Sequence, residues 1–131
     1  MYLLDTNTLI YVYRNLGNCR AKLEGHNPSD ICICAVTVAE IEYGIAKSVR
    51  PDGLRLFLAD VQNRYTLQAM SLEAASRAGQ LRAVLERQGL PISPYDLLIA
   101  GIALASGLTV VTRNTREFSR VPNLTVENWY D

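Results

Sequence analysis

Short apolar stretches of strand type alternate along this chain with longer stretches of helical periodicity, and this alternation limits the folds open to it. Strands so short and so apolar are typical of a sheet that is covered on both faces. The sequence therefore predicts an α/β fold, a three-layer α/β/α sandwich around a mainly parallel sheet. Strands are expected at residues 2–4, 31–36, 66–70, 108–111 and 124–127, and helices at 6–15, 19–24, 37–48, 51–64, 72–89 and 94–107, with a helical turn at 115–118.

Length and composition favour one compact domain over residues 1–131, of which 49% are hydrophobic. No apolar run approaches the ~18 residues of a membrane span, and the first residues lack the basic start of a signal peptide. We therefore expect a cytoplasmic protein without membrane association. The 13 Lys and Arg residues balance the 13 Asp and Glu residues, which argues against broad electrostatic binding of nucleic acid but allows a local basic rim.

The three cysteines, Cys19, Cys32 and Cys34, do not have the spacing of a zinc site, and His26 is the only histidine. The odd number of cysteines fits a reducing compartment. Cys32 and Cys34 are two residues apart in a strand-type run, so they should point to the same face of the sheet. We expect them to be small buried hydrophobic residues.

Acidic residues recur where predicted strands give way to helices. Asp5 follows the first strand, Glu40 lies near the start of the helix after the second, and Glu117 lies just beyond the strand at 108–111. The carboxyl ends of parallel strands share one edge of a sheet, where ligands bind. Asp96 opens the most apolar helix, but a loop precedes it, so its place at that edge is a hypothesis.

Carboxylates gathered at one place require compensation. Two unit charges ~4 Å apart repel by ~4 kcal/mol at an effective dielectric constant near 20, so a cation or bound protons must offset the cost. Oxygen ligands of this kind suit Mg²⁺ or Mn²⁺, which can activate water and stabilise charge on a phosphoryl oxygen.

Each acid also has a purely local explanation. Thr37 and Glu40 have the spacing of a capping box, and so do Ser93 and Asp96. Asp5 has the position of an ordinary helix N-cap, and Glu117 that of a residue in a solvated turn. These explanations account for helix starts, but they give no reason for the acids to meet.

Four segments in order resemble the VapC toxins, the PIN-domain nucleases of VapBC toxin–antitoxin pairs. They are LLDTN at 3–7, TVAEIEYG at 37–44, PYDLLIA at 94–100 and VVTRNTREF at 110–118, and Trp129 follows. Each segment alone is weakly specific, whereas the four together span essentially the whole chain. The tail NTREF at 114–118, followed by Pro122 and Trp129, resembles that of the enterobacterial-type VapC toxins, which cut initiator tRNA in the anticodon stem-loop.

The resemblance implies a metal-dependent endoribonuclease that leaves 5′-phosphate and 3′-hydroxyl ends. Asp5, Glu40 and Asp96 match the family's acidic positions, with Asp5 and Asp96 as ligands of one Mg²⁺ or Mn²⁺, and Glu40 acts directly or through water. Many PIN domains have aspartates in the fourth motif, where this chain has Asn114 and Glu117. Glu117 would complete the catalytic set, again directly or through water.

Further residues enter as supporting groups. Thr6 matches the hydroxyl residue beside the first acid, and Asn114 would hold a water or orient Asp5. The candidate RNA contacts are Arg14, Arg113 and Arg116, although arginines near acids are more often ion-pair partners. The resemblance also implies a VapB antitoxin that places a cation among the acids, a homodimer and a larger toxin–antitoxin assembly.

Two other classes remain open at this point. A PIN-like module could bind RNA or a protein without cleaving anything, and a purely structural α/β domain could carry the same segments. Metal-dependent cleavage that is lost on Asp5→Asn separates an enzyme from a binding module. An effect of metal on stability separates both from a structural domain.

Overall fold

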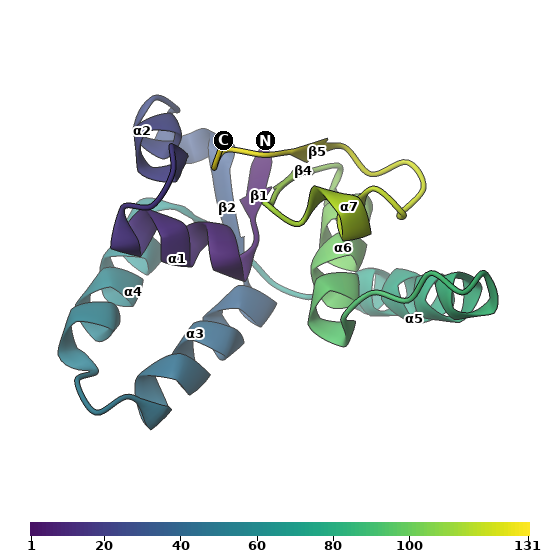
Figure 1. Ribbon diagram of the computed structural model, residues 1–131, viewed down its shortest axis with the longest axis horizontal. Coiled ribbons are helices and arrows are strands. Elements are labelled where there is room, and N and C mark those ends of the chain that lie inside the picture. Colours follow the sequence, from purple (N-terminus) through teal and green to yellow (C-terminus); the bar gives the residue numbers. More distant parts are fainter.

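The computed structural model describes residues 1–131 and contains one five-stranded sheet with the strand order β3-β2-β1-β4-β5 (Figure 1). Every neighbouring pair of strands is parallel. The predicted α/β class with a parallel sheet is therefore confirmed. The strands are β1 (Tyr2–Leu4), β2 (Ile31–Cys34), β3 (Thr66–Gln68), β4 (Thr109–Val111) and β5 (Val126–Glu127).

Helices cover both faces of the sheet, as expected for three layers. One core contains side chains of α1 to α4 and the other contains side chains of α5, α6 and the buried Phe118 of α7. The helices are α1 (Thr6–Arg14), α2 (Cys19–Glu24), α3 (Ala35–Lys47), α4 (Asp52–Arg64), α5 (Leu72–Arg87), α6 (Pro94–Ser106) and α7 (Thr115–Phe118), and a 3-10 turn, η1, occupies Pro28–Asp30.

Successive side chains along each strand point to opposite faces of the sheet and therefore into different cores. Leu3 packs with the α5–α6 core, whereas Leu4 packs with the α1–α4 core. Cys32 and Cys34 share the α5–α6 core, as predicted, and all three cysteines are buried and unpaired. Since a parallel sheet buries both faces, its strands need no polar alternation.

Several element boundaries differ from the prediction: β3 ends at Gln68 rather than at residue 70, and β5 begins at Val126 rather than at residue 124. The difference at the end of β2 affects the site. The apolar run that begins at Ile31 was expected to stay extended to residue 36, but β2 ends at Cys34 and α3 already begins at Ala35. Ala35 and Val36 suit a strand and a helix equally well by hydrophobicity, so periodicity could not locate the change. The η1 turn was not predicted; Asn27 caps it by accepting from the Ser29 amide.

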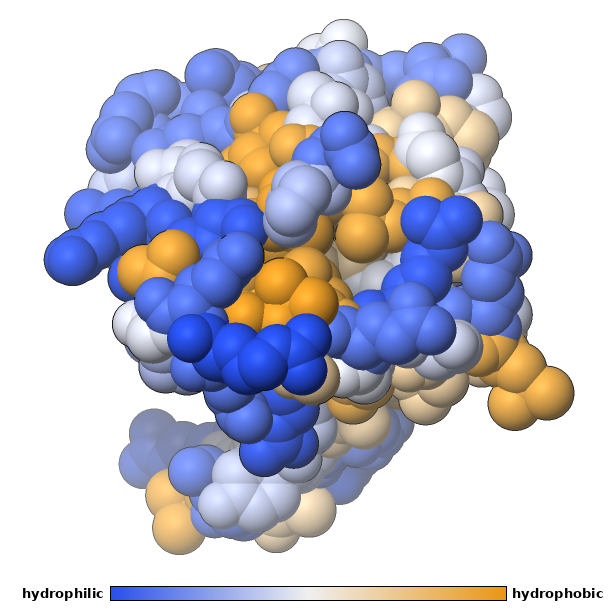
Figure 2. All heavy atoms as spheres, turned by 90° about the vertical axis from the view of Figure 1, so that its right-hand side faces the viewer, coloured by the Kyte–Doolittle hydropathy of each residue, from blue (hydrophilic) through white to orange (hydrophobic).

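α5 and α6 pack closely, and Gly101 makes this approach possible. An added Cβ at Gly101 would lie 2.5 Å from the Ala74 carbonyl oxygen and 3.0 Å from the Ala78 Cβ. α5 projects from the sheet in Figure 1, and the view from that side shows a hydrophobic area bordered by hydrophilic side chains (Figure 2). None of the helices has the length and apolarity needed to cross a bilayer.

Candidate active site

The four predicted acids come from four separate segments. Asp5 directly follows β1, Glu40 lies in the second turn of α3 after β2, and Glu117 lies in α7 after β4. Asp96 lies in the first turn of α6. The structure brings all four to one edge of the sheet. They lie close enough there that the carboxylates of Asp5, Glu117 and Glu40 each raise the pKa of Asp96.

Asp96 bears most of the cost of this arrangement. Burial raises the pKa of Asp96, and repulsion from Asp5, Glu117 and Glu40 raises it further, to about 6 from the usual 3.8. A side-chain hydrogen bond with Asn114 acts in the opposite direction. The position of Asp96 at this edge was only a hypothesis from the sequence, because no strand leads into α6.

Asp5 is both a helix cap and a member of the acidic cluster. It is only 4% exposed, and its Oδ1 accepts a hydrogen bond of 2.8 Å from the Thr8 amide at the start of α1. Burial raises the pKa of Asp5, and hydrogen bonds from the side chains of Thr112 and Thr8 oppose that rise. The interpretation of Asp5 as an N-cap is therefore correct, but it describes only one of its contacts.

Glu40 is held from α1 rather than by its own helix. The Thr6 hydroxyl donates to Glu40 Oε1 over 2.7 Å and lies 3.2 Å from the Thr37 hydroxyl. Since α3 begins at Ala35, Thr37 lies inside the helix and does not cap it. The capping-box explanation of Thr37 and Glu40 is therefore wrong. The same explanation fails at α6, where Ser93 is the N-cap residue but its side chain makes no capping bond.

Asn114 connects two of the acids. Its Nδ2 donates to Glu117 Oε2 over 2.9 Å, and its side chain also bonds to Asp96. Asn114 does not orient Asp5 in this structure, because Asp5 is contacted by Thr8 and Thr112 instead. Glu117 is partly buried rather than part of a freely solvated turn.

Thr8 and Thr112 were missed at the sequence level, and Thr37 was assigned only to a helix cap. All three are almost completely buried, and a buried hydroxyl needs a partner. Thr112 was the easiest to find, since it is a polar residue directly after an apolar strand. Its Oγ1 accepts from the Asn114 amide, so it ties the turn after β4 to the acidic edge.

The three candidate arginines form no ion pairs. The four ion pairs of the structure join other residues on the surfaces of α4 and α5. The Arg113 guanidinium carbon lies 3.6 Å from the ring centroid of Tyr130, and a hydrogen bond to Tyr11 raises the pKa of Arg113. Arg14 and Arg116 are exposed. The expectation that these arginines pair with the acids is therefore wrong.

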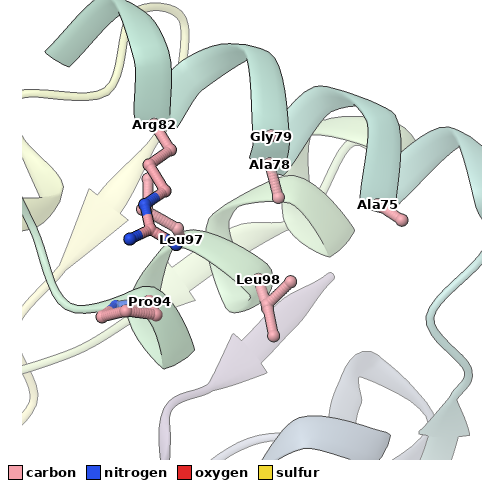
Figure 3. Close-up of a pocket in the computed structure, with 7 residues that line it drawn as sticks. All are labelled: Ala75, Ala78, Gly79, Arg82, Pro94, Leu97 and Leu98. Atoms are coloured by element: carbon pink, nitrogen blue, oxygen red, sulfur yellow. The ribbon is translucent and has the colours of Figure 1, made fainter. Parts of the chain in front are cut away.

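An apolar pocket of about 240 Å³ between α5 and α6 lies apart from this chemistry (Figure 3). No carboxylate lines it, and Arg82 is its one charged side chain. Its lining residues are Ala75, Ala78, Gly79, Arg82, Pro94, Leu97 and Leu98.

The donor set of the acidic edge suits a hard divalent cation. It consists of carboxylate oxygens with hydroxyl and amide groups behind them, without histidine or thiolate. As the side chains stand, no three of the acids form a closed group that could hold an ion. The raised pKa of Asp96 has burial as its largest cause, and repulsion from the other three carboxylates adds to it.

Comparisons with known proteins agree with the fold. The PIN-domain family model matches residues 2–124, so the class defined by the sheet and its acids is that of a PIN domain. The tRNA(fMet)-specific endonuclease VapC of Salmonella typhimurium is 38% identical over 98% of this chain and 97% of its own length. Ribonuclease VapC2 of Haemophilus influenzae is 37% identical over 98% and 97%.

Solved structures give the same result. The DNA-bound VapBC complex from Salmonella typhimurium contains a chain with a TM-score of 0.89 and 39% identity, covering 98% of this chain and 97% of that one. VapBC2 from Rickettsia felis, bound to a promoter DNA fragment, gives a TM-score of 0.88 and 35% identity, with 98% of both chains covered. The chain therefore belongs to the VapC family of PIN-domain proteins, which confirms the resemblance found in its sequence.

Proposed function

We propose that this chain, as one PIN domain over residues 1–131, is a metal-dependent endoribonuclease, the toxin of a VapBC-type pair. Asp5, Glu40, Asp96 and Glu117 are the catalytic carboxylates. The observation that carries the proposal is the pKa of Asp96, which burial and three neighbouring carboxylates raise to about 6. Such an arrangement costs stability, and perturbed carboxylates of this kind are typical of active sites.

Asp5 and Asp96 would hold a divalent cation, Mg²⁺ or Mn²⁺, with Glu40 and Glu117 beside it directly or through water. When bound, the cation supplies a Lewis acid that offsets the acids' repulsion and stabilises negative charge on a phosphoryl oxygen. This role is consistent with the oxygen-only donor set and with the high pKa of Asp96.

The chain's own residues position the reacting groups. Thr8 and Thr112 hold Asp5, Thr6 holds Glu40, and Asn114 holds Glu117. Glu40 and Glu117 accept hydrogen bonds from the attacking water and orient it toward the phosphorus. The water forms a new P–O bond as the P–O3′ bond breaks, and the departing 3′ oxygen takes up a proton, so the products are a 5′-phosphate and a 3′-hydroxyl. Positioning and electrostatics of this kind supply most of the catalysis in phosphoryl transfer.

The substrate we propose is initiator tRNA, cut in its anticodon stem-loop. The Salmonella relative, 38% identical, is named for tRNA(fMet). Enzymes that read single-stranded loops need unpaired nucleotides that can splay into an open site. Arg113 and Arg116 stand exposed beside Asn114 and Glu117, where they can bind RNA phosphates. The Arg113–Tyr130 stack also offers a flat surface to a base.

The partner we propose is a VapB antitoxin in the cytoplasm, with the toxin as a homodimer in a larger complex. The solved relatives are VapBC complexes, some of them bound to DNA. A neutral protein with an acidic edge is suited to inhibition by a basic side chain that enters among Asp5, Glu40, Asp96 and Glu117, since that charge replaces the cation.

Total tRNA provides the test. Purified protein freed of antitoxin is incubated with it in Mg²⁺ or Mn²⁺, alongside Asp5→Asn and Asp96→Asn. Discrete fragments from the wild type alone support the proposal, and mapping their ends checks both the target and the end chemistry. If the folded wild type cuts no tRNA but cuts another RNA, the tRNA assignment is wrong. If it binds RNA and cuts none, the chain is a binding module.

A further inference from the structure

A hollow of about 460 Å³ lies between the last turns of α1 and α3 and the start of α4. Its charged lining residues are all basic: Arg14 at the end of α1, Lys47 at the end of α3, and Arg50 in the link to α4. Ile10 and Tyr13 of α1 form part of its floor, and neither Asp nor Glu lines it. In a chain of zero net charge, this is a separate positive site.

The three cations of this basic hollow are free to bind a ligand. None of them takes part in the four ion pairs of the structure, and all three side chains are exposed. Lys47 Nζ lies 4.8 Å from the ring centroid of Tyr43, a contact that leaves its charge uncompensated. Cations that serve only to neutralise neighbouring acids would be paired with them.

The basic hollow and the acidic edge are connected by α1 and α3, which contribute residues to both. α1 and α3 begin side by side at the acidic edge, where Thr6 bonds to Glu40, and they diverge toward α4 (Figure 1). The helix rise of 1.5 Å per residue gives a distance of about 10 to 12 Å along each helix, from Thr6 to Arg14 in α1 and from Glu40 to Lys47 in α3. An RNA strand covers such a length in a few nucleotides.

We propose that the basic hollow is a backbone-phosphate subsite for the RNA substrate, a few nucleotides from the bond that is cut. The inference rests on the proposed ribonuclease function. A strand that places one phosphate at the acids must run away from them, and along α1 and α3 its later phosphates would reach Arg14, Lys47 and Arg50. Arginine forks bind phosphate through two hydrogen bonds, and lysine adds a point charge.

The separation of charge explains why such a subsite is useful. RNA phosphates are repelled by the acids that the reaction requires, so most binding energy must come from cations at a distance from Asp96. Phosphate contacts supply position and affinity without reading sequence. The subsite therefore contributes to KM, and the acidic edge contributes to kcat.

Steady-state cleavage of a fluorescein-labelled anticodon stem-loop of initiator tRNA tests the subsite. The variant is Arg14→Gln with Lys47→Gln and Arg50→Gln. The control carries the same charge change on the opposite side of the sheet, Arg77→Gln with Arg82→Gln and Arg87→Gln. A third protein, Arg14→Lys with Lys47→Arg and Arg50→Lys, keeps the charge. KM and kcat are measured from about 50 to about 200 mM KCl.

The subsite predicts that the first variant raises KM about 10- to 100-fold, keeps kcat within about twofold, and lowers the salt slope of log kcat/KM by about 2. The control should resemble the wild type, and the charge-keeping variant should keep the wild-type salt slope and a KM closer to that of the wild type than the first variant has. Equal KM and salt slope in the first variant and the control overturn the subsite and leave the ribonuclease in place. Loss of kcat alone also overturns it. If the wild type cuts no RNA, the proposed function fails, and the subsite fails with it.

Discussion

At the scale of single residues, Asp96 trades stability for function. Its folded-state pKa, about 6, lies above the usual 3.8. At neutral pH the ionised carboxylate of Asp96 therefore destabilises the folded protein. Asp96→Asn should therefore raise the free energy of unfolding at pH 7 without metal while abolishing cleavage. We expect about 1 to 2 kcal/mol, below the ~3 kcal/mol of two pKa units, because water screens a partly exposed carboxylate.

The pH dependence has a definite sign. Since the folded-state pKa is the higher one, lowering the pH through 6 protonates Asp96 in the folded state first, and the wild type gains stability relative to Asp96→Asn. The advantage of the variant should shrink between about pH 7 and about pH 4. Urea unfolding in EDTA at several pH values measures this, and a variant that is less stable than wild type throughout would contradict it.

Thr6 is a second residue whose role is testable. Thr6→Val keeps the shape of the side chain but removes the donor to Glu40 Oε1. We expect kcat to fall about 10-fold or more with little change in KM, because Glu40 loses its orientation, and stability to change by about 1 kcal/mol or less. Thr125→Val, at an exposed threonine outside the acidic edge, is the control. Equal effects of the two substitutions would remove Thr6 from the site.

The acids themselves were predictable, but most of their contacts were not. Asp5, Glu40 and Glu117 follow strands, and a parallel sheet must bring such residues to one edge. Asp96 follows a loop, so only tertiary structure could place it. The hydroxyl partners Thr8, Thr37 and Thr112 depend on which helix lies opposite each strand end, which local sequence does not encode. Thr37 in particular was assigned to a cap because the start of α3 was placed two residues late.

At the scale of elements, the contact between α5 and α6 depends on the absence of a side chain at Gly101. Gly101→Ala would place a methyl group 2.5 Å from the Ala74 carbonyl oxygen. We expect a loss of about 1 to 3 kcal/mol in the free energy of unfolding. Because α6 carries Asp96, cleavage should fall as well.

Gly79 on α5 provides the matched comparison. An alanine Cβ there would meet nothing within 4 Å, so Gly79→Ala should stabilise the protein by about 0.5 to 1 kcal/mol through helix propensity alone. Urea unfolding curves of the two variants give both values. We expect the two substitutions to change the free energy of unfolding in opposite directions. A stabilising effect of Gly101→Ala would show that α5 and α6 can move apart without loss of stability.

The order of the elements was predicted well, because it follows from periodicity and from the Gly and Pro residues that end helices. Gly107 closes α6 in the left-handed conformation, with φ of 65°, and Pro94 opens that helix. Boundaries inside apolar runs were less certain, as at Cys34 and Ala35. There strand and helix preferences coincide, and packing decides.

At the scale of the whole molecule, a divalent cation should act as a folding ligand. A ligand that binds only the folded state stabilises it by about 2.7 kcal/mol at 100 times its Kd, and here it also removes repulsion among the acids. Mn²⁺ or Mg²⁺ should therefore raise Tm in the wild type and much less in Asp5→Asn or Asp96→Asn. Differential scanning calorimetry with and without EDTA measures the shift. If neither metal changes the Tm of the wild type, the chain is better explained as a purely structural domain.

The four acids are spread from Asp5 near the start of the sequence to Glu117 close to its end, and this spacing has a consequence for the chain as it is made. Translation delivers them in order, at about 5 to 20 residues per second. Until α7 has emerged and settled beside β5, the growing polypeptide has an incomplete acidic edge. A PIN domain built this way cannot have its full set of acids in place before α7 folds.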